Sequence, residues 1–182
     1  MGTVTTLPHG QAFTRDALDA MPEDGHRYEL IDGSLIVTPA PSPRHQRMAF
    51  RLGVLLDASR PEDHEVLMAP LDVALAEDSV LQPDLLVARR SDFTEKDLPV
   101  APLLAVEILS PSTRRLDLTL KRSRYESAGC PSYWVLDPDT PSLTAWALRD
   151  EVYVESANVA GDQEFTTEAP FAVSFSPSQL LA

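Results

Sequence analysis

The chain has 182 residues, of which 43% are hydrophobic and 24% charged, and these values fit one globular domain with a substantial core. They argue against a disordered chain, and an apolar stretch such as residues 103–109 is far shorter than the ~20 residues that cross a bilayer. The formal net charge of −13 argues against a protein that coats nucleic acid in general.

The N-terminus and the cysteine content bear on the compartment. The first residues lack the basic-then-apolar order of a signal peptide. Cys130 is the single cysteine, so it cannot form a disulfide within the chain, which is typical of a reducing compartment. We therefore expect a cytoplasmic protein with no membrane partner. Along the chain, we expect a tail at residues 1–12 and a single domain at residues 13–182.

The first predicted elements are a short helix and a β-hairpin. Residues 13–21 are expected to form the helix, and residues 28–31 and 34–38 the two strands of the hairpin. Asp32-Gly33 between the strands is typical of a tight turn, because both residues tolerate a positive φ.

The middle of the chain begins with a long amphipathic helix. Its apolar residues recur at helical spacing over residues 44–59. Short strands are expected at 65–68 and 71–75, followed by a strand at 81–88. Pro83 in that strand must lie where no ladder donor is needed.

A buried strand and a second helix follow. Residues 103–109 are almost all apolar, which is typical of a strand buried on both faces. The helix after it is expected to end at Ala128, before Gly129. The remaining predicted strands are 132–136, a hairpin of 143–148 and 152–156, and a short strand near 171–175. This order predicts an α/β (mixed α+β) domain, with a central mixed sheet flanked by helices, an N-terminal hairpin and a C-terminal β extension.

Two acidic residues stand out in these strands. Glu107 is the one charged residue in the apolar run 103–109, and burying a lone carboxylate costs several kcal/mol unless it is paired or binds a metal. Asp84 follows Pro83 in the predicted strand, although a Pro-Asp pair alone occurs more often in turns. A hard divalent cation such as Mg²⁺, held by two carboxylates and waters, would give Glu107 its partner.

The helix after Glu107 adds a lysine. Asp117, Lys121 and Tyr125 are four residues apart and therefore lie along one helical face. The connection from Glu107 is short, so the lysine can reach the space between Glu107 and Asp84. The sequence thus predicts that Asp84, Glu107 and Lys121 converge on one site.

Simpler roles remain open for these residues. Glu107 can instead form a buried ion pair with Arg114 or Arg115. Lys121 and Asp117 can form an ordinary surface pair on the helix.

The basic residues are concentrated in two predicted helices, which hold nine of the fifteen. They form either two solvated helix faces or a positive floor inside an acidic shell. These residues are Arg44, Arg47, Arg51, Arg60, Arg114, Arg115, Lys121, Arg122 and Arg124.

Several stretches together resemble one protein family. They are Tyr28 to Gly33, His45 at the start of the long helix, Gln82-Pro83-Asp84, Val106 to Thr113, the series Asp117, Lys121 and Tyr125, then Gly129 and Tyr133-Trp134. As a set they resemble the Uma-two family of restriction-endonuclease-like proteins, in the PD-(D/E)XK nuclease superfamily. The resemblance covers roughly Arg27 to Phe175.

The resemblance implies a nuclease fold, a homodimer and Mg²⁺-dependent (or Mn²⁺-dependent) hydrolysis of phosphodiester bonds in DNA. Asp84, Glu107 and the backbone carbonyl of Ile108 would hold the metal ion. Lys121 would position the attacking water or stabilise the developing negative charge.

Four further residues are candidate accessory groups. By the resemblance, Glu29 would be an additional acid near the metal, although an exposed hairpin glutamate is an equal alternative. His45 can approach the site from its helix start, although a surface histidine is the simpler expectation. Asp117 and Tyr125 share the helical face of the lysine.

One departure bears on activity. The superfamily pattern places a lysine two residues after the second acid, where this chain has Leu109. The family resembled has the same substitution, and Lys121 from the following helix would take the role. Together with the net charge, Leu109 keeps open a non-catalytic binding or regulatory protein, and also a metal-dependent hydrolase of a small phosphorylated ligand.

Overall fold

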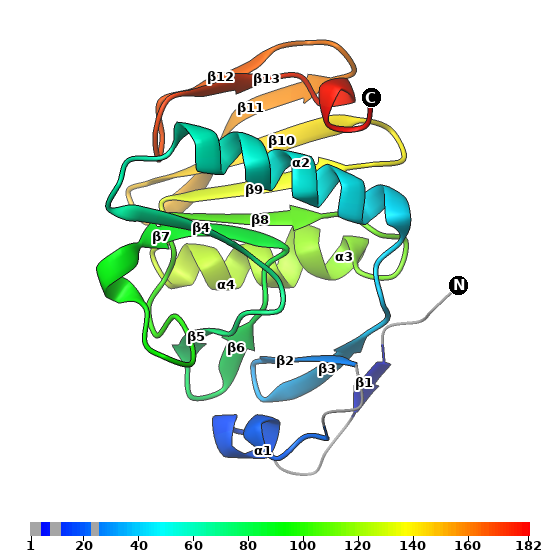
Figure 1. Cartoon of the computed structure of the whole chain (residues 1–182). Helices are drawn as coiled ribbons and strands as arrows, with labels where there is room; N and C mark the ends of the chain where they lie inside the picture. Colours follow the sequence, from blue (N-terminus) through cyan, green and yellow to red (C-terminus); the bar gives the residue numbers. More distant parts are fainter. Residues whose placement is uncertain (1–4, 8–11, 23–25) are drawn as a thin grey trace.

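A computed structural model describes residues 5–7, 12–22 and 26–182, and it has the mixed α+β architecture that the sequence predicts. Two main sheets lie one above the other in Figure 1, with helices packed on both faces of the larger sheet. Among the described residues, no helix combines the length and apolar character that crossing a membrane would require.

The smaller sheet contains the N-terminal hairpin. Its strand order is β1-β3-β2-β6-β5, and helix α1 (Arg15–Asp19) packs against β2. The strands are β1 (Thr5–Leu7), β2 (Arg27–Ile31), β3 (Ser34–Thr38), β5 (Val73–Ala76) and β6 (Ser79–Leu81). The turn between β2 and β3 has the predicted conformation, with φ of 53° at Asp32 and 69° at Gly33.

The larger sheet has the order β11-β10-β9-β8-β7-β4, and only the β8–β9 pair within it is parallel. Its strands are β4 (His64–Met68), β7 (Leu85–Arg89), β8 (Leu104–Ile108), β9 (Ser132–Asp137), β10 (Ser142–Arg149) and β11 (Val152–Ala160). A separate hairpin of β12 (Phe165–Thr167) and β13 (Val173–Phe175) packs beside it, and two short 3₁₀ helices lie at Arg90–Asp92 and Ser178–Leu180.

Helices cover the two faces of the larger sheet. Helix α2 (Pro43–Ser59) lies on one face, and α3 (Arg114–Leu116), a π-helical turn (Asp117–Lys121) and α4 (Arg122–Ser127) run continuously on the other (Figure 1).

Because side chains alternate along a strand, β8 contributes to two cores. Val106 and Ile108 pack with α2, whereas Ala105 packs with Tyr125 of α4. The side chain of Glu107, which lies between Val106 and Ile108 on the strand, therefore points toward the helix that carries Lys121.

One expectation for a strand was wrong in detail. The predicted strand 81–88 is two strands, β6 and β7, interrupted at Gln82-Pro83-Asp84. Pro83 has no N–H for a ladder, and the interruption lets the chain pass from the smaller sheet to the larger one. Within the expected tail, Thr5–Leu7 forms β1 and pairs with β3, while residues 1–4 and 8–11 lie outside the described part of the chain.

Candidate active site

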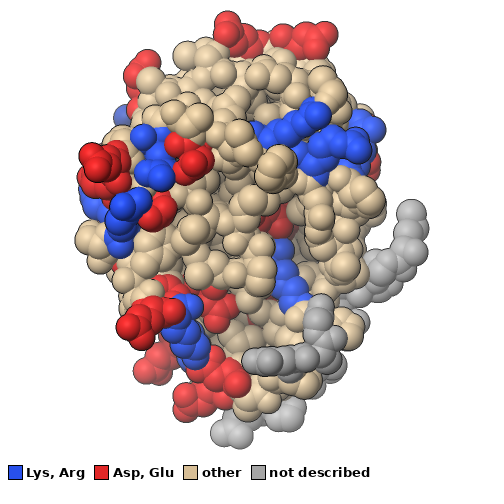
Figure 2. Space-filling view, in the orientation of Figure 1, with Lys and Arg blue, Asp and Glu red and all other residues tan. Residues whose placement is uncertain are grey.

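A pocket of about 940 Å³ lies where the two sheets meet. Residues from β2, from the start of α2 and from the loop after β8 line it. Figure 2 shows the surface hollowed between the upper and lower parts of the molecule, with acidic and basic side chains visible inside. The predicted residues Asp84, Glu107 and Lys121 all line this pocket.

Asp84 occupies the interruption between β6 and β7, so the expectation that it lies within a strand was wrong. Its Oδ2 accepts hydrogen bonds from the backbone N–H of Ile108 at 2.8 Å and from Nε2 of His45 at 3.0 Å. Its Oδ1 accepts one from Arg27 at 3.0 Å. Burial alone would raise the pKa of Asp84, but the His45 hydrogen bond and the Arg27 charge outweigh it and hold that pKa below its usual range. Asp84 is therefore a carboxylate at neutral pH.

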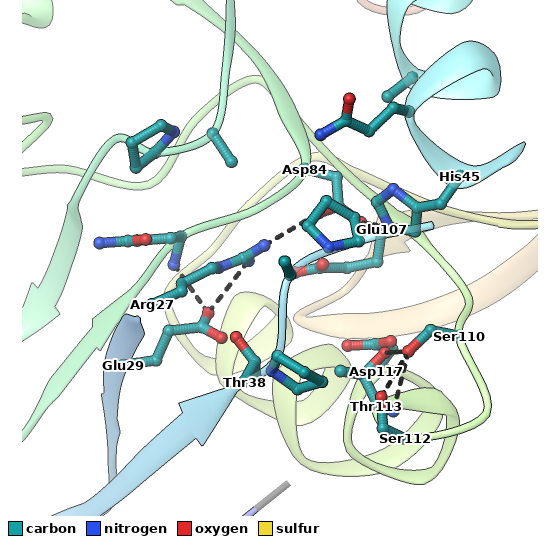
Figure 3. A pocket seen from close by; sticks show the side chains of 18 of the residues that line it. Arg27, Glu29, Thr38, His45, Asp84, Glu107, Ser110, Ser112, Thr113 and Asp117 are labelled. Atoms are coloured by element: carbon teal, nitrogen blue, oxygen red, sulfur yellow. Dashed lines mark hydrogen bonds and ion pairs between the residues drawn. The ribbon is translucent and has the colours of Figure 1, made fainter. Parts of the chain in front are cut away.

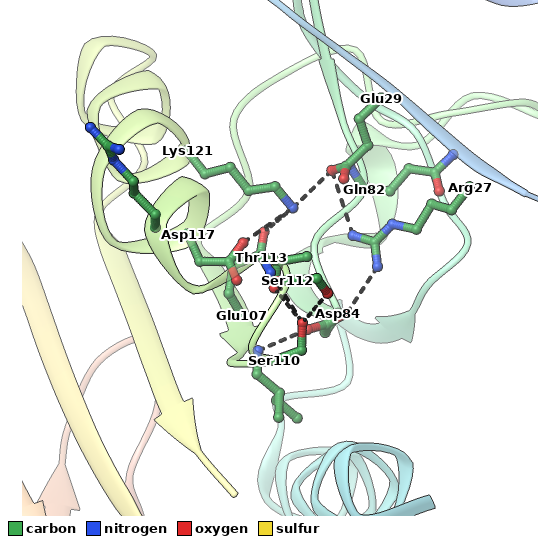
Figure 4. A network of polar contacts seen from close by, with 12 residues as sticks. Arg27, Glu29, Gln82, Asp84, Glu107, Ser110, Ser112, Thr113, Asp117 and Lys121 are labelled. Atoms are coloured by element: carbon green, nitrogen blue, oxygen red, sulfur yellow. Dashed lines mark hydrogen bonds and ion pairs between the residues drawn. The ribbon is translucent and has the colours of Figure 1, made fainter. Parts of the chain in front are cut away.

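Lys121 lies at the centre of a buried ion cluster (Figure 4). Its Nζ is 2.9 Å from Glu29 Oε1, 3.1 Å from Glu107 Oε1 and 3.6 Å from Asp117 Oδ1. Burial would lower the pKa of Lys121, but the surrounding carboxylates outweigh that effect and raise it, so the amine stays charged.

The interpretation of Lys121 and Asp117 as a surface pair is wrong, because both side chains are buried. Both residues belong to the π-helical turn, a rare conformation that recurs at functional sites.

Glu107 and Asp117 hold their protons more tightly than ordinary carboxylic acids. Burial raises the pKa of Glu107 well above its usual value, and the Lys121 charge offsets this only in part. Burial likewise raises the pKa of Asp117 to about 6. The alternative ion pair between Glu107 and Arg114 is not formed, because Arg114 pairs with Asp137.

Glu29 reaches the cluster from the smaller sheet. It is fully buried, which rules out the exposed hairpin glutamate. Its Oε1 accepts a hydrogen bond from the backbone N–H of Gln82 at 2.8 Å, in addition to the contact with Lys121. Burial would raise the pKa of Glu29, but the charges of Arg27 and Lys121 outweigh it and lower that pKa.

Arg27 is a member of the site that the sequence did not reveal. Its guanidinium lies between Asp84, at 3.0 Å, and Glu29, at 3.5 Å, and Figure 3 shows it pointing into the pocket. The available signal was its position two residues before Glu29, which places both side chains on one face of β2.

His45 is buried and contacts Asp84, so the expectation of a surface histidine is wrong. Ser42 caps the start of α2 by accepting a hydrogen bond from the His45 backbone N–H at 3.2 Å, and this fixes the helix end over the pocket.

Tyr125 is buried and its ring stacks on Tyr133, with 5.4 Å between the ring centroids. It is absent from the pocket lining, although the other accessory candidates Glu29, His45 and Asp117 line it.

A group of hydroxyls borders the acids. Ser110 Oγ is 2.9 Å from Ser112 Oγ and 3.0 Å from Thr113 Oγ1, in the loop that connects β8 to α3 (Figure 3). This loop carries the chain from Glu107 to the helix of Lys121, so its hydrogen bonds help to fix the distance between the two residues.

The charges around the pocket floor do not balance. Four carboxylates, from Glu29, Asp84, Glu107 and Asp117, face the two permanent cations Arg27 and Lys121, so the fully ionised cluster carries −2. Two buried carboxylate oxygens, Glu29 Oε2 and Asp117 Oδ1, have no hydrogen-bond partner within the described part of the chain. Such a cluster favours an added positive charge, from protons or from a metal cation.

Comparisons with known proteins agree with this fold. No curated protein matches the chain. A solved structure described as a "putative nuclease belonging to DUF820" from Anabaena variabilis has a similar fold, with a TM-score of 0.76 and 20% sequence identity over 93% of this chain and 97% of that one. The family model described as "Putative restriction endonuclease" matches residues 15–180. The chain therefore belongs to this family, Uma2.

Proposed function

We propose that this protein is a metal-dependent nuclease that hydrolyses phosphodiester bonds in DNA. The observation that carries the proposal is the buried cluster of four carboxyl groups and two permanent cations on the floor of an open pocket, because this cluster has two more acids than cations. The family description, and the description of the similar structure as a nuclease, point to the same class of reaction.

The residues present fit one divalent cation of the Mg²⁺ or Mn²⁺ type. Among the described residues, no three His, Cys, Asp or Glu side chains are grouped so that they could hold a metal by themselves. Mg²⁺ does not need such a cage, because it is usually held by one or two carboxylates, waters and substrate phosphates. Asp84 and Glu107 would supply the carboxylates.

The backbone carbonyl of Ile108 would complete the protein ligands. In the β7–β8 register Leu85 lies opposite Val106, so continuing the register by two residues places Pro83 opposite Ile108. A ladder partner at this position would donate an N–H to the Ile108 carbonyl, and proline has none. Pro83 therefore leaves the carbonyl oxygen of Ile108 without a donor from the ladder, so that this oxygen could bind the metal.

When bound, the cation would polarise a phosphoryl oxygen and lower the pKa of a water. Lys121 would donate a hydrogen bond to that water or to the developing negative charge, and Glu107 and Glu29 hold its amine in place. His45 would orient Asp84 through the hydrogen bond to Oδ2.

We also propose that the protein acts as a homodimer. The surface that supports this is β11, an edge strand of the larger sheet, where Val152 and Val154 are exposed. An edge strand is a template for pairing, and a second copy of the same edge would cover the two exposed valines with two-fold symmetry.

A second candidate function is a metal-dependent hydrolase of a small phosphorylated ligand. The net charge of −13 favours it, because such a ligand needs no extended basic surface.

A cleavage assay tests the proposed function. A labelled DNA mixture of single strands and duplexes is incubated with Mg²⁺ and wild-type protein, with Asp84→Ala, with Lys121→Ala and with the control Glu62→Gln, an exposed acid outside the pocket lining. We expect cleavage by the wild type and the control, none in EDTA, and a loss of at least about a hundredfold in both site variants. Wild type that cuts neither form, or site variants that cut normally, would contradict the proposal.

A further inference from the structure

We infer that the site acts on an unpaired nucleic-acid strand rather than on an intact duplex. This inference rests on the proposed function and names its substrate class. The two acids proposed to hold the metal are buried at the bottom of the pocket, because Asp84 is only 6% exposed and Glu107 only 1%. A scissile phosphate has to descend to them through the pocket.

The size of the pocket limits what can descend. Its volume of about 940 Å³ lies at the upper end of the ~300–1,000 Å³ typical of sites that enclose a small molecule. In a duplex each phosphate is fixed to a stack of paired bases, and the second strand moves with it. An unpaired strand rotates freely about its backbone, so a few of its nucleotides can enter where a duplex would rest on the rim.

The walls of the pocket suit exposed bases. Tyr28 of the smaller sheet and Phe50 of α2 both line it, and Phe50 is 62% exposed. Met21, Pro41 and Met68 extend the apolar lining. Any unpaired base, whatever its sequence identity, can stack on an aromatic side chain. The bases of a duplex present only their edges in the grooves.

Charge favours the same substrate. A duplex carries one negative charge per ~1.7 Å of axis and a single strand one per ~3.4 Å, so a strand meets about half the repulsion from a chain of net charge −13. Figure 2 shows a basic patch on the upper part of the molecule, over α2, whereas acidic and basic residues are mixed at the left and lower left of this face. On α2, Arg44 and Arg47 are exposed and lie next to the residues of the helix start that line the pocket. This small number of basic side chains fits a single strand, which needs few phosphate contacts.

The test compares one DNA sequence in three forms: single strand, duplex, and duplex with an unpaired flap. We expect kcat/KM with Mg²⁺ to be at least about tenfold higher for the single strand and the flap than for the duplex, with cuts inside the unpaired part. Equal or faster cleavage of the duplex would overturn the inference and leave the proposed function standing. Failure to cut any form would overturn both.

A matched pair of variants on α2 tests the role of the wall. Phe50→Ala removes a ring that lines the pocket, whereas Val54→Ala shortens a side chain that is 54% exposed on the same helix and lies outside the lining. Stacking predicts that Phe50→Ala weakens single-strand binding at least about fivefold, measured by fluorescence anisotropy in Ca²⁺, and that Val54→Ala does not. Equal affinities of the two variants would overturn the stacking part of the inference.

A small phosphodiester, bis(p-nitrophenyl) phosphate, separates the remaining outcomes. Its hydrolysis by wild type, with loss in Asp84→Ala, combined with no cleavage of any DNA form, would show a metal-dependent phosphodiesterase and overturn the unpaired-strand inference.

Discussion

The amine of Lys121 lies 3.1 Å from Glu107 Oε1, although fourteen residues separate the two along the chain. The PD-(D/E)XK pattern, which the sequence resembles, places a lysine two residues after the second acid, and this chain has Leu109 there. Leu109 is buried in the core that also contains Tyr125. Lys121 lies on a π-helical turn, which brings its amine to the carboxyl group of Glu107.

The buried position of Lys121 leads to a prediction about stability. Lys121→Met removes the amine that pairs with the buried Glu29 carboxylate and contacts Glu107, and breaking a buried pair in this way costs about 3–5 kcal/mol. Urea unfolding in EDTA should show this loss. The matched control Lys96→Met, at a lysine whose side chain is 62% exposed, should change the free energy of unfolding by less than about 0.5 kcal/mol.

A second substitution checks the cause of that loss. The pKa of Glu29 is lowered, so Glu29 is the carboxylate that loses a cation in Lys121→Met. Adding Glu29→Gln to Lys121→Met removes that carboxylate, so we expect part of the lost stability to return. A single Lys121→Met variant as stable as wild type would contradict the account of the ion cluster.

Asp117 should make stability depend on pH. Burial raises its pKa from 3.8 to about 6, so between these values the folded protein keeps a proton that the unfolded chain has lost. Stability from this group is present below pH 4 and is lost as pH rises through 6, by about 3 kcal/mol for a shift of about two units. In Asp117→Asn the side chain is a neutral amide that does not titrate, so this dependence on pH should disappear.

The measurement is urea unfolding of wild type and Asp117→Asn in EDTA at several values between pH 4.5 and 7.5. The difference in free energy of unfolding between the two proteins should grow with pH, in favour of the variant. Parallel pH curves would contradict the raised pKa of Asp117.

The predicted homodimer rests on the edge strand β11. Val154→Lys places a charge at a residue that is 53% exposed on this edge, and a charged edge opposes strand pairing. Sedimentation equilibrium should then show dimer for wild type and monomer for Val154→Lys. Val100→Lys, at an exposed valine outside the strands, is the control and should remain dimeric. A monomeric wild type, or a dimeric Val154→Lys, would rule out this interface.

Local sequence patterns predicted the parts of the fold that depend on neighbouring residues. The Asp32-Gly33 turn follows from the φ preferences of two residues, and helix α2 from the periodicity of residues 44–59. The apolar run around Glu107 predicted a strand with both faces buried, and every residue of β8 is buried.

Features that depend on distant contacts were not predictable in this way. Pro83 indicated a position without a ladder donor, but not that the chain changes sheets there. Burial of His45 depends on Asp84, 39 residues away, and β1 exists because β3 offers it an edge. The π-helical turn at Asp117–Lys121 has no local sequence pattern, since it forms together with the ion cluster that it supports.

Metal affinity should fall as the solution becomes more acidic. Burial raises the pKa of Glu107 well above its usual value, so in the absence of metal this carboxylic acid keeps a proton that Mg²⁺ has to displace. Calorimetric titration in two buffers of different ionisation enthalpy should therefore show proton release on binding. Binding with no proton release would contradict Glu107 as a ligand.

The central claim is that Asp84 and Glu107 hold one divalent cation, and calorimetric titration of Mg²⁺ and Mn²⁺ tests it most directly. Wild type and the control Glu168→Gln, at an exposed glutamate, should bind one ion per chain. Asp84→Asn and Glu107→Gln should each lose at least about tenfold in affinity, because each removes a charged ligand. A wild type that binds neither ion, even with DNA present to supply phosphate ligands, or variants that bind as the wild type does, would contradict the claim.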